Sequence, residues 1–187
     1  SVHTTVLLLQ RPDGSFEKAN APYVGQTQSI VAADFNGDSH VDLYLGRRAN
    51  AGERDALLLG DGTGRLTDSS ASLPPRPHDT RHVVAVDLDG DGDMDIVKAN
   101  DDAPNSYYRN DGRGQFQELV GLPTARSPSR WIDAGDFDGD GDLDLLVAND
   151  DPTQGDQLLR NDGTQRFQVV SLPSTRSSQQ ARFVDLD

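Results

Sequence analysis

An acidic motif recurs about every 50 residues along this chain and strongly limits the folds open to it. It reads DFNGDSHVD at residues 34–42, DLDGDGDMD at 87–95 and DFDGDGDLD at 136–144, and VDLD at 184–187 begins a further copy. Repeats with periods of roughly 20 to 50 residues are typical of proteins built from stacked copies of one small unit. We therefore expect a repeat protein.

Two other features keep the same period. A glycine-bearing turn recurs as PDGSF at 12–16, GDGTGRL at 60–66, NDGRGQF at 110–116 and NDGTQRF at 161–167, and Leu-Pro pairs recur at 73–74, 122–123 and 172–173. The chain therefore reads as a single segment with complete repeats at 29–78, 79–128 and 129–178 and partial repeats at 1–28 and 179–187.

Each repeat contains four short segments of β-forming residues, which in the second complete repeat are 82–88, 95–100, 106–110 and 115–120. Asp-Gly between the last two predicts a tight hairpin, because glycine takes the positive φ that such turns need. Four strands with short connections make one antiparallel meander. A single meander cannot bury both of its faces, so copies must stack around an axis or along a line. The unit length and strand count favour an all-β propeller of four-stranded antiparallel blades.

The composition excludes several classes of protein. The net charge is -14, from 31 acidic and 17 basic residues, and the basic residues form no stripe of the kind that nucleic acid requires. No apolar run approaches the ~20 residues of a membrane-spanning helix, so we predict no transmembrane segment in this chain. The absence of cysteine excludes disulfides and thiolate metal sites.

The second acidic loop has the chemistry of a cation site. Asp87, Asp89 and Asp91 alternate with other residues, so a tightly curled loop brings their carboxylates together, and Asp95 closes the far side. Like charges about 4 Å apart repel by several kcal/mol unless a cation lies between them. Oxygen-only ligands, high charge and a flexible loop favour calcium over zinc or magnesium.

The loop is not an EF-hand, although both begin D-x-D-x-D-G. An EF-hand requires a bidentate glutamate at its twelfth position and helices on both sides. The twelfth positions here are Leu45, Lys98 and Val147, and the flanking segments are β-like.

With its flanking strands and its period, the motif resembles the D-x-D-x-D-G-x-x-D calcium loop of FG-GAP or VCBS repeats, which form integrin α-subunit-like β-propellers. The resemblance covers essentially the whole chain. It implies four side-chain ligands in each loop and one main-chain carbonyl, which belongs to His40, Asp93 or Asp142. The implied ligands are Asp34, Asn36, Asp38, His40 and Asp42; Asp87, Asp89, Asp91, Asp93 and Asp95; Asp136, Asp138, Asp140, Asp142 and Asp144; and, in an incomplete fourth loop, Asp185 and Asp187.

The first loop departs from this pattern twice. Asn36 removes one negative charge, and Ser39 stands where the other loops have Gly92 and Gly141. We expect this loop to bind calcium more weakly than the other two.

The order of the segments predicts fifteen strands: two in the first partial repeat, twelve in the complete repeats, and one inner strand at the end. Propellers of the resembled family usually have seven blades, so the resemblance implies a segment of a larger propeller with partial blades at both ends. The alternative is a small four-bladed ring that lacks one strand.

We expect calcium to act mainly as a structural ion, because an ion that binds only the folded state stabilises it. Extracellular modules hold calcium with a Kd near ~10⁻⁴ to 10⁻³ M. Sites of that affinity are filled outside the cell, which favours an extracellular, cell-surface or periplasmic location.

The face opposite the calcium loops is the expected binding surface for a protein or carbohydrate ligand, as in the resembled family. Its candidate residues are His78, Arg81, His82, Arg126, Arg130 and Trp131, beside Asp101, Asp102, Asp150 and Asp151. Trp131 offers a ring that stacks on a sugar or anchors a protein partner. The alternative is that Trp131 packs near the start of an inner strand.

No motif for nucleophilic, zinc-dependent or phosphate-binding catalysis occurs, and the four histidines form no constellation. We therefore expect a non-enzymatic recognition or adhesion module. The alternative is an accessory or catalytic propeller of a secreted hydrolase, lyase or redox protein.

Overall fold

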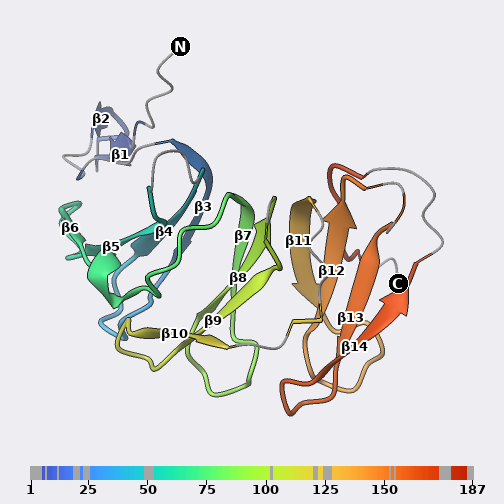
Figure 1. Ribbon diagram of the computed structural model, residues 1–187. Helices are drawn as coiled ribbons and strands as arrows, with labels where there is room; N and C mark the ends of the chain where they lie inside the picture. Colours follow the sequence, from blue (N-terminus) through green and yellow to red (C-terminus); the bar gives the residue numbers. More distant parts are fainter. Residues whose placement is uncertain are drawn as a thin grey trace.

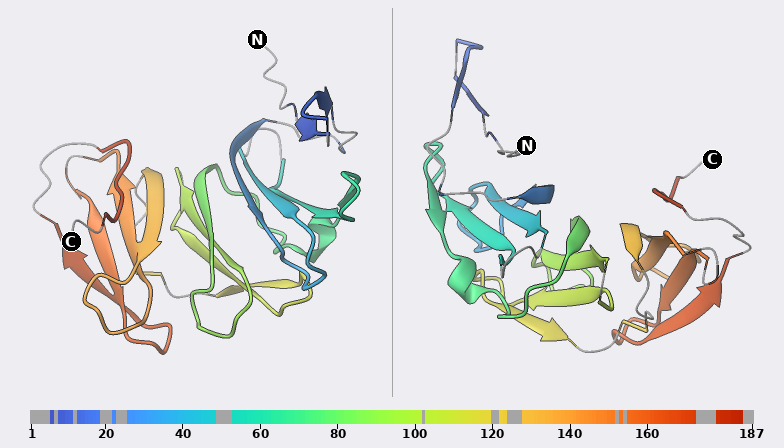
Figure 2. Two further views of the ribbon diagram at one scale, coloured as in Figure 1. Left: turned by 180° about the vertical axis from the view of Figure 1, so that it is seen from behind. Right: turned by 45° about the horizontal axis from the view of Figure 1, so that its top comes forward.

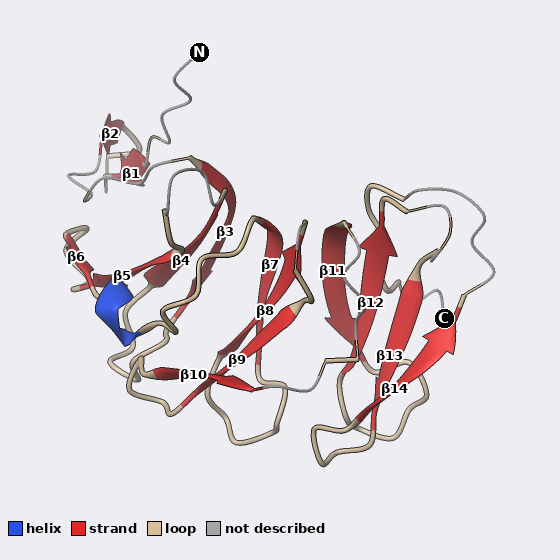
Figure 3. Ribbon diagram, in the orientation of Figure 1, coloured by secondary structure: helices blue, strands red, loops and turns tan. Residues whose placement is uncertain are grey.

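The computed structural model describes residues 6, 8–11, 13–18, 22, 26–48, 53–101, 103–119, 122–123, 128–151, 153, 155–172 and 178–184. Within them the chain forms antiparallel β-structure with one short 3-10 turn at Ser70–Ser72 (Figure 3). The predicted all-β class is confirmed.

Three four-stranded sheets follow one another along the chain, preceded by a two-stranded hairpin (Figure 1). Each sheet is an antiparallel meander in which neighbouring strands are consecutive in sequence. The hairpin consists of β1 (Leu8–Gln10) and β2 (Phe16–Lys18). Blade one contains β3 (Thr27–Ala33), β4 (Asp42–Arg47), β5 (Ala56–Gly60) and β6 (Leu66–Asp68); blade two contains β7 (Thr80–Val86), β8 (Asp95–Asn100), β9 (Ser106–Asn110) and β10 (Phe116–Leu119); blade three contains β11 (Ser129–Gly135), β12 (Asp144–Asn149), β13 (Gln157–Asn161) and β14 (Phe167–Ser171).

The blades are arranged like the sectors of a fan (Figure 2, right). The first strands β3, β7 and β11 lie along the inner side, where β7 contacts both of the others. The fourth strands lie along the outer side. This is the propeller arrangement that the repeats predicted.

The hydrophobic core lies between the blades. Ile96 and Val97, consecutive residues of β8, point to opposite faces of blade two, as side chains of a strand must. Ile96 packs with Phe35 and other residues of blade one, whereas Val97 packs with Ile132 and other residues of blade three. Each fully buried side chain of this kind contributes roughly 1.5–3 kcal/mol. A blade is therefore stable only when it is packed against its neighbours.

One buried ion pair joins blade one to blade two. Lys98 on β8 is completely buried, and its Nζ lies 2.8 Å from Asp55 Oδ2 and 3.0 Å from the hydroxyl of Tyr108. Asp55, just before β5, also accepts hydrogen bonds from the Tyr44 hydroxyl and the Arg47 amide, both at 2.8 Å. Burial opposes the charge on Lys98, but the nearby Asp55 carboxylate keeps the lysine pKa above its usual value.

The expected fifteenth strand is not formed by the described residues 178–184. These residues lie beside β11, where the Phe183 amide donates a hydrogen bond to the Asp133 side chain at 3.0 Å and the Phe183 ring covers Gly135. The Phe183 amide bonds a side chain rather than a backbone carbonyl of β11, and no strand is assigned within residues 178–184. None of the described helical segments has the length and apolar character needed to cross a membrane.

Replacing Lys98 by methionine tests the importance of the buried pair. We expect Lys98→Met to lower the free energy of unfolding by about 3–5 kcal/mol, because Asp55 keeps a buried charge without its cation. Lys18→Met, at an exposed position of β2, is the control and should change stability by less than about 0.5 kcal/mol. Chemical denaturation of both variants makes the measurement. Equal effects of the two substitutions would contradict this role.

Candidate functional site

The three acidic motifs form equivalent loops between the first and second strands of the three blades. Loop one is residues 34–42, loop two is 87–95 and loop three is 136–144, and we number the positions of each loop from one to nine. All three lie at the lower ends of the blades in Figure 1. The rigid strands on either side therefore hold both ends of each loop.

Aspartates at the first and fifth positions fold the loop by accepting backbone hydrogen bonds. In loop two, Asp87 accepts from the amides of Gly90 at 2.9 Å and Gly92 at 3.0 Å, and Asp91 accepts from the amide of Asp93 at 3.0 Å. Gly92 has φ +93°, which only glycine adopts without steric cost. Loop three repeats this pattern with distances of 2.7 to 3.0 Å.

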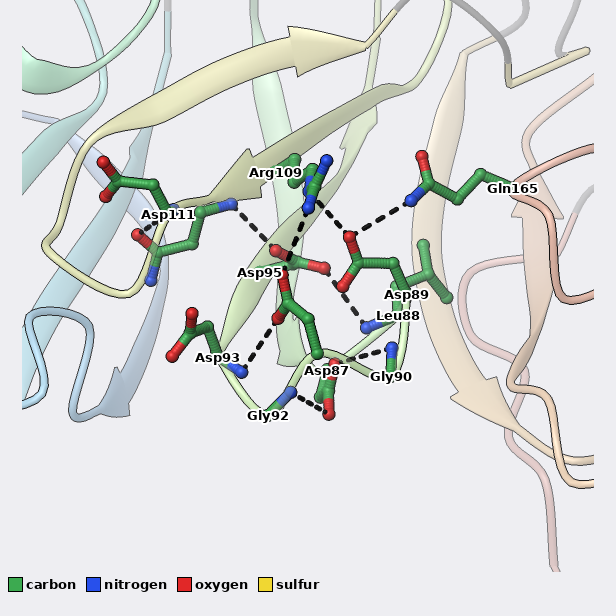
Figure 4. A network of polar contacts seen from close by, with 12 residues as sticks. Asp87, Leu88, Asp89, Gly90, Gly92, Asp93, Asp95, Arg109, Asp111 and Gln165 are labelled. Atoms are coloured by element: carbon green, nitrogen blue, oxygen red, sulfur yellow. Dashed lines mark hydrogen bonds and ion pairs between the residues drawn. The ribbon is translucent and has the colours of Figure 1, made fainter.

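The aspartate at the ninth position is fully buried in every loop. The Asp95 carboxylate accepts a hydrogen bond from the Leu88 amide at 3.2 Å (Figure 4). It also accepts hydrogen bonds from the Asn110 amide and the Tyr107 hydroxyl, both at 2.8 Å. Burial raises the pKa of Asp95 to about 6 despite these donors. Asp95 thus fastens the loop to the end of β9.

The side chain at the seventh position turns away from the loop and covers a glycine in the outer hairpin of its own blade. A Cβ placed on Gly112 would lie 2.4 Å from Asp93 Oδ2, and one placed on Gly163 would lie 2.4 Å from Asp142 Oδ2. In loop one the His40 ring lies over Gly62 in the same way. This orientation leaves the main-chain carbonyl as the ligand expected from the seventh residue.

Two clusters of carboxylates have the geometry of a metal site. Asp87, Asp89 and Asp95 each bring an oxygen within 4.8 Å of the others. The equivalent cluster in loop three consists of Asp136, Asp138 and Asp144. The structure thus brings together the first, third and ninth positions of loops two and three, whereas the predicted ligands Asp91 and Asp140, at the fifth position, lie outside both clusters.

Asp89 carries an atom whose environment suits a cation. Its side chain is only 5% exposed, and Oδ1 is buried and accepts no hydrogen bond from the described residues. Burial and the nearby Asp91 charge raise the Asp89 pKa, and the charge of Arg109 opposes them. A buried carboxylate oxygen without a donor costs free energy unless a positive charge faces it. The donor set therefore fits a hard cation that prefers oxygen.

Arginines on the third strands pair with these loops, a contact that was not predicted from the sequence. On β9, Arg109 Nε lies 2.7 Å from Asp89 Oδ2, and Arg109 Nη2 lies 3.3 Å from Asp91 Oδ2. On β13, Arg160 pairs with Asp138. The equivalent residue of blade one is Leu59. Loop one has the neutral Asn36 at the third position, so arginine occurs on the third strand only in the blades whose third loop position is aspartate. This pairing of residue types is visible in the sequence and could have predicted the contact.

Loop one has a different internal arrangement. Asn36 donates to Asp38 Oδ2 at 3.0 Å and accepts the Asp38 amide at 3.0 Å, so its side chain bonds within the loop. Ser39 has φ +66°, a left-handed conformation that costs about 1–2 kcal/mol for a residue other than glycine. Among the described residues, loop one forms no cluster of three acidic side chains. The predicted weaker binding there remains a prediction.

The predicted ligand face is crossed by a ladder of ion pairs. Arg81 pairs with Asp101 of its own blade, and Arg130 lies 2.6 Å from Asp150 in its blade and 3.7 Å from Asp101 in the preceding one. Arg48 of blade one reaches Asp79 of blade two at 3.5 Å. The same face holds His78, whose Nε2 lies 3.8 Å from Glu118. Arg48 and Arg130 on this face therefore link neighbouring blades.

His82 and Trp131 are brought together by the packing of β7 against β11. Their rings are stacked, with centroids 3.6 Å apart and an interplanar angle of 19°. The guanidinium of Arg182 lies 5.2 Å from the centre of the Trp131 ring. Burial lowers the pKa of His82. A sugar that stacked on this indole would compete with these two neighbours.

Four residues named in the sequence analysis fall outside the described residues. They are Asp102 and Arg126 of the ligand face and Asp185 and Asp187 of the incomplete fourth loop.

Comparison with known proteins agrees with the repeat structure. A family model described as an FG-GAP-like repeat matches residues 34–98, 87–147 and 136–187, and each match begins at the first aspartate of a loop. No curated protein matches the chain. Among solved structures, the chain is similar to that of an Agrocybe aegerita lectin that specifically recognises non-reducing terminal N-acetylglucosamine.

The similarity to the lectin is one of fold. The TM-score is 0.55 at 20% sequence identity, and the similarity covers 92% of this chain and 46% of the lectin chain. This chain therefore spans about half the length of that protein.

The raised pKa of Asp95 predicts how cation binding depends on pH. Below about 6 the Asp95 carboxyl carries a proton that a cation must displace, so affinity falls as the pH falls. At pH 5 we expect the calcium Kd of loop two to be about tenfold higher than at pH 7, since one pKa unit is a factor of ten. Calorimetric titration at both pH values tests this. A Kd that stays constant from pH 7 to pH 5 would show that Asp95 does not titrate with the site.

Proposed function

Because the chain belongs to the FG-GAP-like repeat family, we propose that it is a calcium-binding β-propeller module that recognises a protein or a carbohydrate outside the cell. The role proposed for it is binding without catalysis. The family membership, the acidic loops and the similarity in fold to a lectin support this proposal.

The observation that carries the calcium proposal is the Asp89 carboxylate, which belongs to a cluster with Asp87 and Asp95. Its buried Oδ1 accepts no hydrogen bond from the described residues. Calcium, when bound, supplies two positive charges that such carboxylates share. Zinc prefers nitrogen and sulfur ligands, and magnesium demands a stricter octahedron than a flexible loop offers.

The chain's own residues already define the shape of each loop. Asp87 and Asp91 order the backbone, and Asp95 ties it to β9. The remaining cost is repulsion among the clustered carboxylates, which a cation relieves. Calcium therefore acts as a structural ion in this proposal, and it stabilises the folded blades in proportion to its binding.

Recognition is assigned to the opposite ends of the blades, away from the loops. There the ladder of ion pairs and the stacked His82 and Trp131 form a surface that runs from blade to blade. A rigid surface loses little conformational entropy on binding. The similarity to a lectin that recognises terminal N-acetylglucosamine makes carbohydrates the first ligands to test.

The proposed location follows from the affinity expected of the loops. Calcium sites of extracellular modules have a Kd near ~10⁻⁴ to 10⁻³ M and are filled at the millimolar calcium found outside cells. A module that depends on such sites for stability is suited to an extracellular or secreted protein.

Thermal unfolding with and without calcium tests the metal proposal. At a calcium concentration of 100 Kd, each occupied site adds about 2.7 kcal/mol, which raises the Tm by roughly 5–10 °C for a chain of this size. We expect EDTA to remove this increase and magnesium to reproduce little of it.

Matched variants connect the increase in Tm to the loops. The double variant Asp87→Asn with Asp136→Asn should abolish most of the increase. The control is Asp61→Asn with Asp162→Asn, which also removes two charges that accept turn amides but leaves the clusters intact. A Tm that does not respond to 10 mM calcium in the unmodified chain would refute the calcium proposal.

A glycan and protein binding screen tests recognition. We expect at least one glycan or protein to bind in the presence of calcium and to be released by EDTA, with terminal N-acetylglucosamine included as a candidate. Immobilised chain and a labelled glycan panel provide the measurement. Chemical turnover of a glycan, without a stable complex, would favour an enzyme instead.

A further inference from the structure

The outer turns of blades two and three each lie against the acidic loop of the preceding blade. At the junction of blades one and two, Asn110 Nδ2 donates a hydrogen bond of 2.8 Å to the Phe35 carbonyl of loop one. A Cβ placed on Gly114, in the same turn, would lie 3.6 Å from Cβ of Asn36. The third position of loop one therefore faces the turn between β9 and β10.

At the next junction a glutamine occupies the place of that glycine. Gln165 lies in the turn between β13 and β14, at the position equivalent to Gly114, and its Nε2 donates to Asp89 Oδ2 at 3.1 Å. Figure 4 shows Gln165 reaching from blade three toward Asp89 while Arg109 approaches Asp89 from blade two. One ligand of loop two is thus held from two blades.

Gln165 adopts a backbone conformation that its side chain does not favour. Its φ is +61°, and the equivalent residues Gly64 and Gly114 have φ +89° and +72°. Left-handed backbone costs about 1–2 kcal/mol for a residue with a Cβ. A residue that keeps such a conformation points to a role for its side chain. The hydrogen bond to Asp89 is the described contact that such a role would use.

The two oxygens of the Asp89 carboxylate have different surroundings. Arg109 and Gln165 both bind Oδ2, which leaves the buried Oδ1 without a hydrogen bond among the described residues. The equivalent Asp138 pairs with Arg160, and its side chain is 22% exposed compared with 5% for Asp89. Gln165 therefore adds a constraint that arginine alone does not supply.

We propose that Gln165 is a positioning residue for the cation site of loop two, so that calcium bound there also fastens blade three to blade two. This inference rests on the calcium role proposed above. Calcium binding and the Gln165–Asp89 hydrogen bond are thermodynamically coupled, so each strengthens the other by the same factor. Loop two is then both a metal site and a joint between blades.

Site-resolved calcium titration by NMR tests the proposal. The amides of Gly92 and Gly141 make the same hydrogen bond in loops two and three and so report the two sites separately. We expect Gln165→Gly to raise the Kd read at Gly92 about tenfold, as residues that hold metal ligands typically do, and to leave the Kd at Gly141 within about twofold. Glycine suits the positive φ, so the variant should fold.

Two further measurements sharpen the test. Gln165→Asn retains an amide and tolerates left-handed backbone, but it is one methylene too short to reach Asp89, so it should weaken loop two as Gln165→Gly does. In the unmodified chain the side-chain amide of Gln165 should shift with the same calcium midpoint as Gly92.

The outcomes separate this inference from the proposed function. If Gly92 and Gly141 both titrate and neither Gln165 variant changes the Kd at Gly92, the positioning role is wrong and the calcium sites stand. If neither amide responds to 10 mM calcium, both proposals are overturned.

Discussion

The buried aspartate at the ninth position of each loop is the interaction on which the blades depend. Asp42, Asp95 and Asp144 each accept one amide from their own loop and one from the end of the third strand. A carboxylate with these backbone donors joins three segments of chain at one point. In loops two and three the first and third positions are also anionic, so the joint that holds the blade together also brings three negative charges together and favours a bound cation.

The two ends of the blades differ in how far basic side chains neutralise the acidic ones. At the loop end, acidic side chains gather, and Arg109 and Arg160 only partly offset them. At the opposite end, arginines and aspartates alternate from blade to blade and neutralise one another. Between the ends, Lys98 and Asp55 form a neutral buried pair. An external cation is therefore expected at one end of the molecule only.

The sequence predicted those features that depend on local spacing. The four strands of a blade and the loops follow from residues within a few positions of one another, such as the alternation of Asp87, Asp89 and Asp91, and the period follows from the recurrence of the same short motif. Contacts between blades could not be predicted in this way. Lys98 meets Asp55 across 43 positions, and Gln165 meets Asp89 across 76. These pairs require the stacking register of the blades, which no short pattern encodes.

The fifth position of the predicted ligand set also makes a contact that spacing does not encode. Asp91 accepts the Asp93 amide within its own loop, but its pairing with Arg109 joins the loop to β9. The role of Trp131 likewise depends on neighbours distant in sequence, since His82 and Arg182 both approach its ring. In each case the side chain contacts residues that are close to it only in the folded chain.

Anomalous X-ray scattering from crystals grown with calcium would locate the ion. We expect a calcium peak in loop two within about 2.3–2.6 Å of Asp89 Oδ1, the usual calcium–oxygen distance, and a second peak in loop three beside Asp138. A map without calcium in either loop, or with Asp89 Oδ1 turned away from the ion, would contradict this expectation.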